Sequence, residues 1–142
     1  MFIKQVSVFL ENKEGSLAQA TEILAKASIH ILCISLADTN DFGLIRMITS
    51  DPDKAVEILK ESGLSARITP VLGVKLPHSF GMLHKLTQAL SESGINVEYM
   101  YALTSGHENA SILIKTSDME KSEIVIDNSE FELVTPEEAY NL

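Results

Sequence analysis

The chain has 142 residues, of which 45% are hydrophobic and 22% charged, and its formal net charge is −9. This composition excludes a disordered or fibrous chain, and the sequence has no run of roughly 20 apolar residues that could span a membrane. Arg46 and Arg67 are the only arginines, so a basic surface that binds nucleic acid or anionic lipid is also excluded. The single cysteine, Cys33, excludes an intrachain disulfide, and because the first residues lack a signal-peptide pattern we expect a cytoplasmic protein.

The first half of the chain predicts the order strand, helix, strand, strand, helix, strand. Apolar and β-branched residues predict strands at residues 3–10, 29–36, 44–49 and 66–69. Ser16 and Gln19 fit a capping box at the start of the first helix. Apolar residues then follow at helical spacing, and they predict an inner stripe of Leu17, Ala20, Thr21, Leu24 and Ala27.

The second helix of this half is well marked at both ends. Asp51 can cap it, Pro52 suits its first turn, and Gly63 can close it.

The second half of the chain repeats this pattern. Gly15 and Gly81 are 66 residues apart, and at that offset the helical stripe recurs as Leu83, Leu86, Thr87 and Leu90, with Gly94 placed to end the helix. From residue 49 the offset becomes 67, so that residues 49–51 meet residues 116–118. Strands are predicted at residues 71–76, 95–104, 110–116 and 131–134, and a second helix at 119–126.

The repeated order is the split βαβ arrangement. It predicts an α+β fold of two ferredoxin-like βαββαβ units in tandem, each an antiparallel sheet with its helices on one face. We expect one domain at residues 1–70 and another at 71–142, joined near Pro70 with almost no linker.

The loop before the first helix occurs twice in register. Residues 10–17 read Leu-Glu-Asn-Lys-Glu-Gly-Ser-Leu, and residues 76–83 read Leu-Pro-His-Ser-Phe-Gly-Met-Leu. An apolar helix follows each loop, and then Ile29-His30-Ile31 or Ile95-Asn96-Val97. These segments resemble the ACT-domain family of amino-acid-binding regulatory modules, over nearly the whole chain. The likeness is greatest to stand-alone tandem ACT-domain proteins, which have no catalytic domain.

The resemblance implies that an amino-acid effector is held between the first loop and helix start of one domain and the second strand of the same or a neighbouring domain. Glycine lets the backbone turn and lets a ligand approach it, and the free amides of a helix start attract a carboxylate. In the first repeat the matching positions are Asn12, Lys13, Gly15, Ser16, Leu17, His30, Ile31 and Leu32. In the second repeat they are His78, Ser79, Gly81, Met82, Leu83, Asn96, Val97 and Glu98.

The second repeat is the better candidate. Its His-Ser-x-Gly-x-Leu loop is similar to the lysine-binding loop of aspartokinase regulatory domains. The first repeat has Ser28 where the second has Gly94, and Leu32 where the second has the acid Glu98. Both loop glycines and His78 also fit plain surface turns.

Other site chemistries find no support in the sequence. Hydrolase, P-loop and dinucleotide motifs are missing, and His78 and His84 are six residues apart rather than the four that place two zinc ligands on one helical face. We therefore expect no catalytic residue, no metal and no cofactor. Tyr99 and Tyr101 stand at alternate positions of the predicted strand, on the same face as Val97. They could pack in the core, form a dimer contact, or provide a surface on which a ligand rests. An RNA-recognition domain shares the strand order, but the net charge of −9 argues against it.

The sequence thus predicts a non-catalytic sensor of a free amino acid, as a homodimer paired through an open sheet edge. The alternative is an interaction subunit with vestigial ligand sites, which regulates a partner enzyme of amino-acid metabolism by protein contact.

Overall fold

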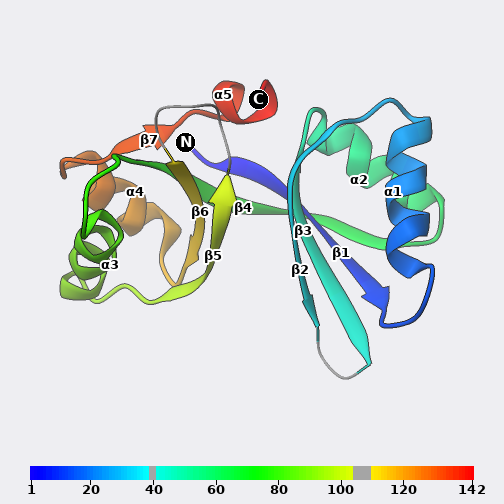
Figure 1. Ribbon diagram of the computed structural model, residues 1–142, viewed down its shortest axis with the longest axis horizontal. Coiled ribbons are helices and arrows are strands. Elements are labelled where there is room, and N and C mark those ends of the chain that lie inside the picture. The colour runs from blue at the N-terminus through cyan, green and yellow to red at the C-terminus, as the bar shows by residue number, and fades with distance from the viewer. Residues whose placement is uncertain (39–40, 104–109) are drawn as a thin grey trace. The chain divides into compact units, whose positions relative to one another are not determined.

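The computed structural model describes residues 1–38, 41–103 and 110–142, and Figure 1 shows its elements in chain order. The first half holds β1 (Ile3–Glu11), α1 (Ser16–Lys26), β2 (Ile31–Asp38), β3 (Phe42–Thr49) and α2 (Pro52–Glu61). The strand β4 (Ser65–Leu76) follows, and then α3 (Met82–Glu92), β5 (Val97–Leu103), β6 (Ala110–Thr116), α4 (Met119–Asp127), β7 (Glu132–Val134) and α5 (Pro136–Tyr140). The predicted fold class and the repeated β-α-β-β-α-β order are confirmed. Thr104, the predicted last residue of the strand at 95–104, lies outside the described residues.

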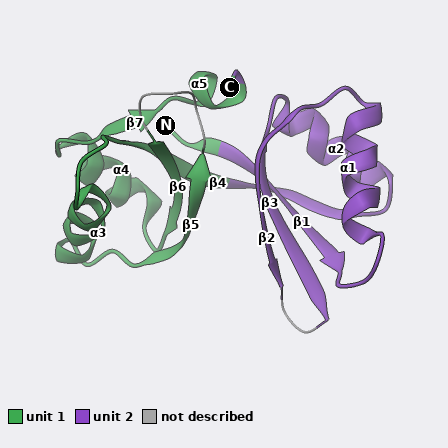
Figure 2. Cartoon of the chain, in the orientation of Figure 1, with its two compact units in different colours: residues 1–3, 70–140, 142 green, residues 4–69, 141 purple. Residues whose placement is uncertain are grey.

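The chain divides into two compact units, which Figure 2 colours separately. Residues 4–69 and Asn141 form one unit, called the first repeat below. Residues 1–3, 70–140 and Leu142 form the other, the second repeat. The strands predicted at 66–69 and 71–76 form one continuous strand, β4, and the division falls within it.

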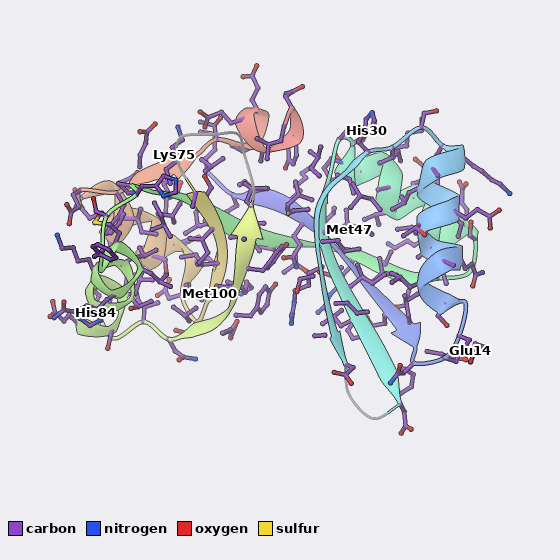
Figure 3. The ribbon with its side chains drawn as sticks, in the orientation of Figure 1. Glu14, His30, Met47, Lys75, His84 and Met100 are labelled. Atoms are coloured by element: carbon purple, nitrogen blue, oxygen red, sulfur yellow. The ribbon has the colours of Figure 1, made fainter. Side chains whose placement is uncertain are left out.

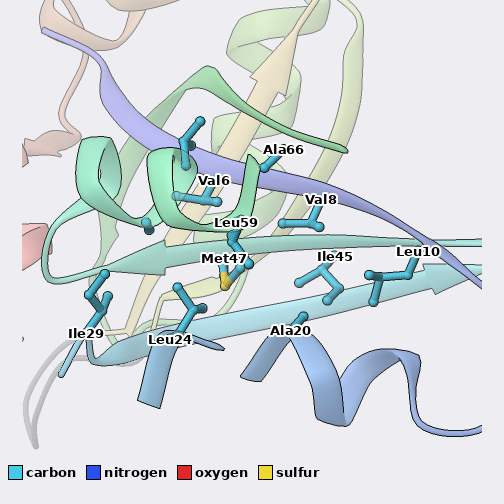
Figure 4. Packing of buried hydrophobic residues seen from close by; sticks show 12 residues of the cluster. Val6, Val8, Leu10, Ala20, Leu24, Ile29, Ile45, Met47, Leu59 and Ala66 are labelled. Atoms are coloured by element: carbon cyan, nitrogen blue, oxygen red, sulfur yellow. The ribbon is translucent and has the colours of Figure 1, made fainter. Parts of the chain in front are cut away.

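The first repeat has the strand order β2-β3-β1-β4, and β3 pairs antiparallel with both β1 and β2. Alternate residues of its strands face α1 and α2, and Figure 4 shows the core that they form. Its fully buried members include Val6, Ile45, Met47 and Leu59. Burying side chains of this size contributes roughly 1.5–3 kcal/mol each, so this face fixes the position of α1 above the sheet.

The second repeat has the order β7-β4-β6-β5, in which β4 pairs antiparallel with β6 and β7, and β5 pairs antiparallel with β6. Leu72, Val74, Leu86, Leu90 and Ile114 form its core with α3 and α4. The two repeats therefore place the same strand order and the same two helices around separate cores.

The predicted capping box at Ser16 is wrong. Gly15 is the N-cap of α1, and no side chain of the described residues caps that helix. Ser16 lies inside the helix and is buried, because the buried stripe starts one residue earlier than predicted and runs Ser16, Ala20, Leu24. The predicted inner residue Leu17 is accordingly 39% exposed, and its counterpart Leu83 is 44% exposed.

A capping box occurs instead at α5, a helix that the sequence analysis did not predict. The Thr135 amide donates to Glu138 Oε2 at 2.8 Å, and the Glu138 amide donates to Thr135 Oγ1 at 3.1 Å. Lys75 Nζ also contacts Glu138 at 3.0 Å and Glu132 at 2.7 Å, so one side chain of β4 holds β7 and α5.

Candidate functional site

The two first loops have the same backbone geometry. Gly15 has φ 84° and Gly81 has φ 79°, left-handed values that favour glycine. Two residues before each glycine an amide closes a tight turn: Lys13 N donates to Glu11 O at 2.9 Å, and Ser79 N donates to Pro77 O at 2.8 Å. A Cβ placed on either glycine would meet nothing within 4 Å, so open space faces the backbone at each helix start.

The first and second helices of each repeat differ in how they begin. The Asp51 carboxylate accepts a hydrogen bond from Lys54 N at 3.2 Å, and the Asp118 carboxylate accepts one from Lys121 N at 3.0 Å. These acids cap α2 and α4. In contrast, α1 and α3 begin at glycines, with no side-chain cap among the described residues. The first amides of α1 and α3 therefore lack the carboxylate that the other two helices carry.

A cavity of about 540 Å³ opens at the start of α3. Its lining includes the predicted residues His78, Ser79, Gly81, Met82 and Leu83, which the structure thus brings together. The sequence analysis missed four other lining residues, namely Leu76, Pro77, Phe80 and Ala110. Leu76, Pro77 and Phe80 belong to the quoted loop and were within reach of sequence reasoning, whereas Ala110 comes from β6 through the sheet pairing Leu76↔Ala110.

The loop of the first repeat is charged. Lys13 and Ser16 line a cavity of about 320 Å³ at the start of α1, together with Glu11, Gln19 and other residues. Lys13 Nζ lies 2.8 Å from the Glu11 carboxylate, and this exposed hydrogen bond lowers the pKa of Glu11 and raises the pKa of Lys13.

The other predicted loop residues of the first repeat do not line that cavity. The amide of Asn12 donates to Asp41 O at 3.1 Å, and Gly15 and Leu17 flank the lining residue Ser16.

The predicted second-strand residues occupy equivalent places in the two repeats. The His30 amide donates to Ser50 Oγ, and the Asn96 amide to Ser117 Oγ, each at 3.0 Å. His30 and Ile31 line a third cavity, of about 480 Å³, beyond the carboxyl end of α1.

The strand register shifts just after each of these segments. The shifts lie between Ile31 and Cys33 and between Val97 and Tyr99, so Leu32 and Glu98 are the two bulge residues. Such bulges redirect side chains and recur beside functional sites. The shift also overturns the expectation that Tyr99 shares a strand face with Val97. Val97 and Met100 both pack against the helix-covered core, so the alternation along the strand puts Tyr99 and Tyr101 on the opposite face.

Glu98 is not an isolated acid. Its carboxylate lies 3.4 Å from Lys115 Nζ, on the neighbouring strand β6.

Within one repeat, the loop and the second-strand residues lie at opposite ends of the sheet. Phe42 at one end of β3 pairs with Glu11, and Thr49 at the other end pairs with Ile31. The eight residues of β3 therefore separate the two sets by roughly 23 Å. Figure 3 shows this separation in the first repeat, with Glu14 in the loop at one end of α1 and His30 beyond the other end. A single repeat thus does not bring its own two sets of candidate residues into one pocket.

The described residues hold no group of three or more His, Cys, Asp or Glu side chains that could bind a metal ion. Burial raises the pKa of the Cys33 thiol to about 11, so that it stays protonated and weakly nucleophilic at neutral pH. None of the helices in the described ranges is long and apolar enough to cross a membrane.

Comparison with known proteins places these observations in a family. The family model described as an ACT domain pair matches residues 1–142. Protein BT0572 from Bacteroides thetaiotaomicron is 39% identical, with a TM-score of 0.93, and the match covers 100% of this chain and 98% of that one.

More distant structures share the fold. The ligand-free regulatory subunit of aspartate kinase from Thermus thermophilus has a TM-score of 0.63 at 17% identity, over 89% of this chain and 92% of that one. The regulatory subunit of aspartate kinase from Thermus flavus has a TM-score of 0.58 at 19% identity, over 87% and 88%. No curated protein matches the chain.

Proposed function

The chain belongs to the ACT-domain family as an ACT domain pair, and we propose that it is a non-catalytic regulatory protein that binds a free amino acid at the first loop of its second repeat. The expected binding set is His78, Ser79, Gly81, Met82 and Leu83 on the loop side. The family supports a regulatory role, and the loop cavity supports its location.

One observation carries the proposal. Two helices of the chain take a carboxylate from Asp51 or Asp118 at their first turn, whereas α1 and α3 begin at glycine and take none from the described residues. The carboxylate of an amino acid would do at α3 what Asp118 does at α4. The helix dipole and the amides of the first turn favour that negative charge.

The α-ammonium group needs acceptors, which the second strand can supply. Asn96, Val97 and Glu98 are too far from the loop of their own repeat, so they would serve the loop of a neighbouring domain. In the order of the described strands, β2 and β5 each stand at an end and have one neighbour. Antiparallel pairing of such an edge with that of a second copy would set the start of one strand beside the end of the other.

We expect a homodimer on this ground, in which loop and strand come from different copies. In the first repeat the strand residues of such a site would be His30, Ile31 and Leu32. Ligand binding would then stabilise one arrangement of the copies and so signal to a partner enzyme.

The test is a thermal-shift screen of the purified chain against the twenty amino acids. A ligand at 100 times its dissociation constant stabilises the folded state by about 2.7 kcal/mol, which raises the melting temperature. If no amino acid raises it at millimolar concentration, the sensor fails and the chain is an interaction subunit with vestigial sites.

The location is tested with matched glycine variants. Gly81→Val should abolish amino-acid binding in calorimetry. Gly63→Val is its control, because Gly63 has φ 85° and equally open surroundings but follows α2 in the first repeat, where it lines the first-repeat cavity and not the proposed site. Circular dichroism should show both variants folded. Unchanged affinity in Gly81→Val would show that the loop is not the site.

A further inference from the structure

The walls of the second-repeat cavity are apolar. Leu76, Met82, Leu83 and Ala110 line it, with Phe80 at the tip of the loop. The polar side chains among the described lining residues are those of His78 and Ser79, and none of the described lining residues is an acid, a lysine or an arginine. A ligand side chain in this cavity would leave water for a hydrocarbon surface.

The first repeat shows that the loop geometry does not require these walls. At the same places in the same turn it carries Glu11, Lys13 and Glu14, where the second repeat carries Pro77, Ser79 and Phe80. The apolar chemistry is therefore a property of the second-repeat loop and does not follow from the turn itself.

Two lining residues present apolar surface that the protein itself leaves uncovered. Phe80 is fully exposed, at 107%, and Leu83 is 44% exposed at the first turn of α3. Single exposed apolar residues are common on protein surfaces. Here both line one cavity of about 540 Å³, which is within the usual range for small-molecule sites and larger than a glycine or alanine side chain requires.

The charges near the candidate site allow for one ammonium group. The only acid among the second-repeat candidate residues is Glu98, and Lys115 Nζ already lies 3.4 Å from it. A shared Glu98 can face the α-ammonium that every amino acid has. A second ammonium, such as that of lysine, would lose its water with no acid among the described lining residues to receive it.

We infer that the second-repeat cavity selects amino acids with an apolar side chain of about four carbon atoms or more, such as norleucine, leucine or phenylalanine, over charged ones. This inference rests on the proposed function. The predicted ligand class therefore differs from lysine, the ligand of the aspartokinase loop that this sequence resembles.

The experiment is calorimetry with the full chain and a matched ligand series. Norleucine and lysine have the same carbon chain and differ in the terminal ammonium. Alanine, norvaline and norleucine differ in methylene count. Each added methylene should tighten binding about fourfold, since burying one contributes about 0.8 kcal/mol. We expect norleucine to bind at least tenfold more tightly than lysine.

The outcomes separate the two proposals. Lysine that binds as tightly as norleucine, or a series without a trend in affinity, overturns the apolar class but leaves amino-acid binding in place. No detectable binding of any of the four ligands at millimolar concentration, together with no hit in the thermal screen, overturns both.

A variant links the selectivity to the walls. Phe80→Ser removes a side chain that packs on nothing and so should not disturb folding. It should lower the affinity for norleucine several-fold more than the affinity for alanine. The control is Ile124→Ser, because Ile124 is 60% exposed on α4 and lies outside the cavity. Equal loss of norleucine and alanine affinity in Phe80→Ser, or a norleucine affinity equal to that of the unmodified chain, would overturn the assignment.

Discussion

The first loops of the two repeats have one backbone and two chemistries. Gly15 and Gly81 have φ values of 84° and 79°, and each is the N-cap of a helix without a side-chain cap. Around that glycine the first repeat places a Lys13–Glu11 ion pair, whereas the second places Phe80 and an apolar cavity. Backbone geometry depends on a few positions such as the glycine, and the remaining loop positions are free to change the kind of ligand.

The cores of the two repeats differ in a similar way. Thr116 Oγ1 lies 2.7 Å from Ser122 Oγ, and Ser122 Oγ donates to Asp118 O at 2.7 Å. At the offset of 67 the matching pair is Thr49 and Ala55, so the partner hydroxyl is missing. Thr49 Oγ1 is buried and has no hydrogen-bond partner among the residues that the structure describes. One repeat satisfies a buried threonine, and the other does not.

The largest effect on stability is expected at a position where the first repeat has room for a side chain and the second repeat does not. Gly73 of the second repeat matches Ser7 of the first. In Gly73→Ala the new Cβ would lie 2.9 Å from Val134 Cβ, an overpacking that should destabilise the protein by about 1–3 kcal/mol.

The matched variant is Ser7→Ala. It keeps the Cβ and loses hydrogen bonds to Gln5 and Thr69, which should cost about 1 kcal/mol. Urea denaturation of both variants measures the difference, and a Gly73→Ala variant as stable as the parent would show that β4 and β7 adjust freely.

The next prediction is that the same substitution, threonine to valine, changes stability in opposite directions in the two repeats. Thr49→Val removes an unsatisfied buried hydroxyl and should stabilise the protein by about 1–2 kcal/mol. Thr116→Val removes a satisfied one and should destabilise it by about 1 kcal/mol. The urea midpoints of the two variants should therefore lie on opposite sides of the parent. Two shifts in the same direction would contradict the difference between the cores.

A smaller effect is expected at the end of the first helix. Ser28 has φ 57° where its counterpart Gly94 has φ 73°, so a serine stands in a left-handed conformation. That conformation costs a non-glycine residue roughly 1–2 kcal/mol. Glycine does not have this cost, but it loses roughly 0.5–1 kcal/mol more conformational entropy on folding. Ser28→Gly should stabilise by about 0.5–1 kcal/mol, and Gly94→Ser should destabilise by as much. Thermal melts that move together would refute this.

The smallest effect concerns α5, which the first repeat lacks. Hydrogen bonds from Thr135 and then from Lys75 lower the pKa of Glu138 below its ordinary value of 4.5. Its contribution to stability is therefore present above pH 4.5 and is lost as the pH falls through the folded-state pKa.

Hydrogen exchange at residues 136–140 should accordingly quicken below pH 4 relative to the core of the same repeat, after correction for the intrinsic rate. Glu138→Gln should show faster exchange at neutral pH and no further acid step. An unchanged profile in that variant would show that Glu138 does not hold α5.

Much of this molecule followed from local patterns. The offset between Gly15 and Gly81 predicted two copies of one unit, and Asp51, Pro52 and Gly63 marked α2 because capping and helix termination depend on neighbours in the chain. The capping box at Ser16 failed because the left-handed Gly15 already ends the loop, and α5 was missed because its box spans only Thr135 to Glu138 before a five-residue helix.

The site divides along the same line. The sequence by itself determined which loops turn at glycine and which residue types stand beside them. Only the tertiary structure decided that Ala110 joins the second-repeat loop through pairing with β4, that Glu98 shares its charge with Lys115, and that the loop of the first repeat lies roughly 23 Å from the second-strand residues of that repeat. These facts depend on strand register, which joins residues far apart in the chain, and a pattern read along the chain does not contain that register.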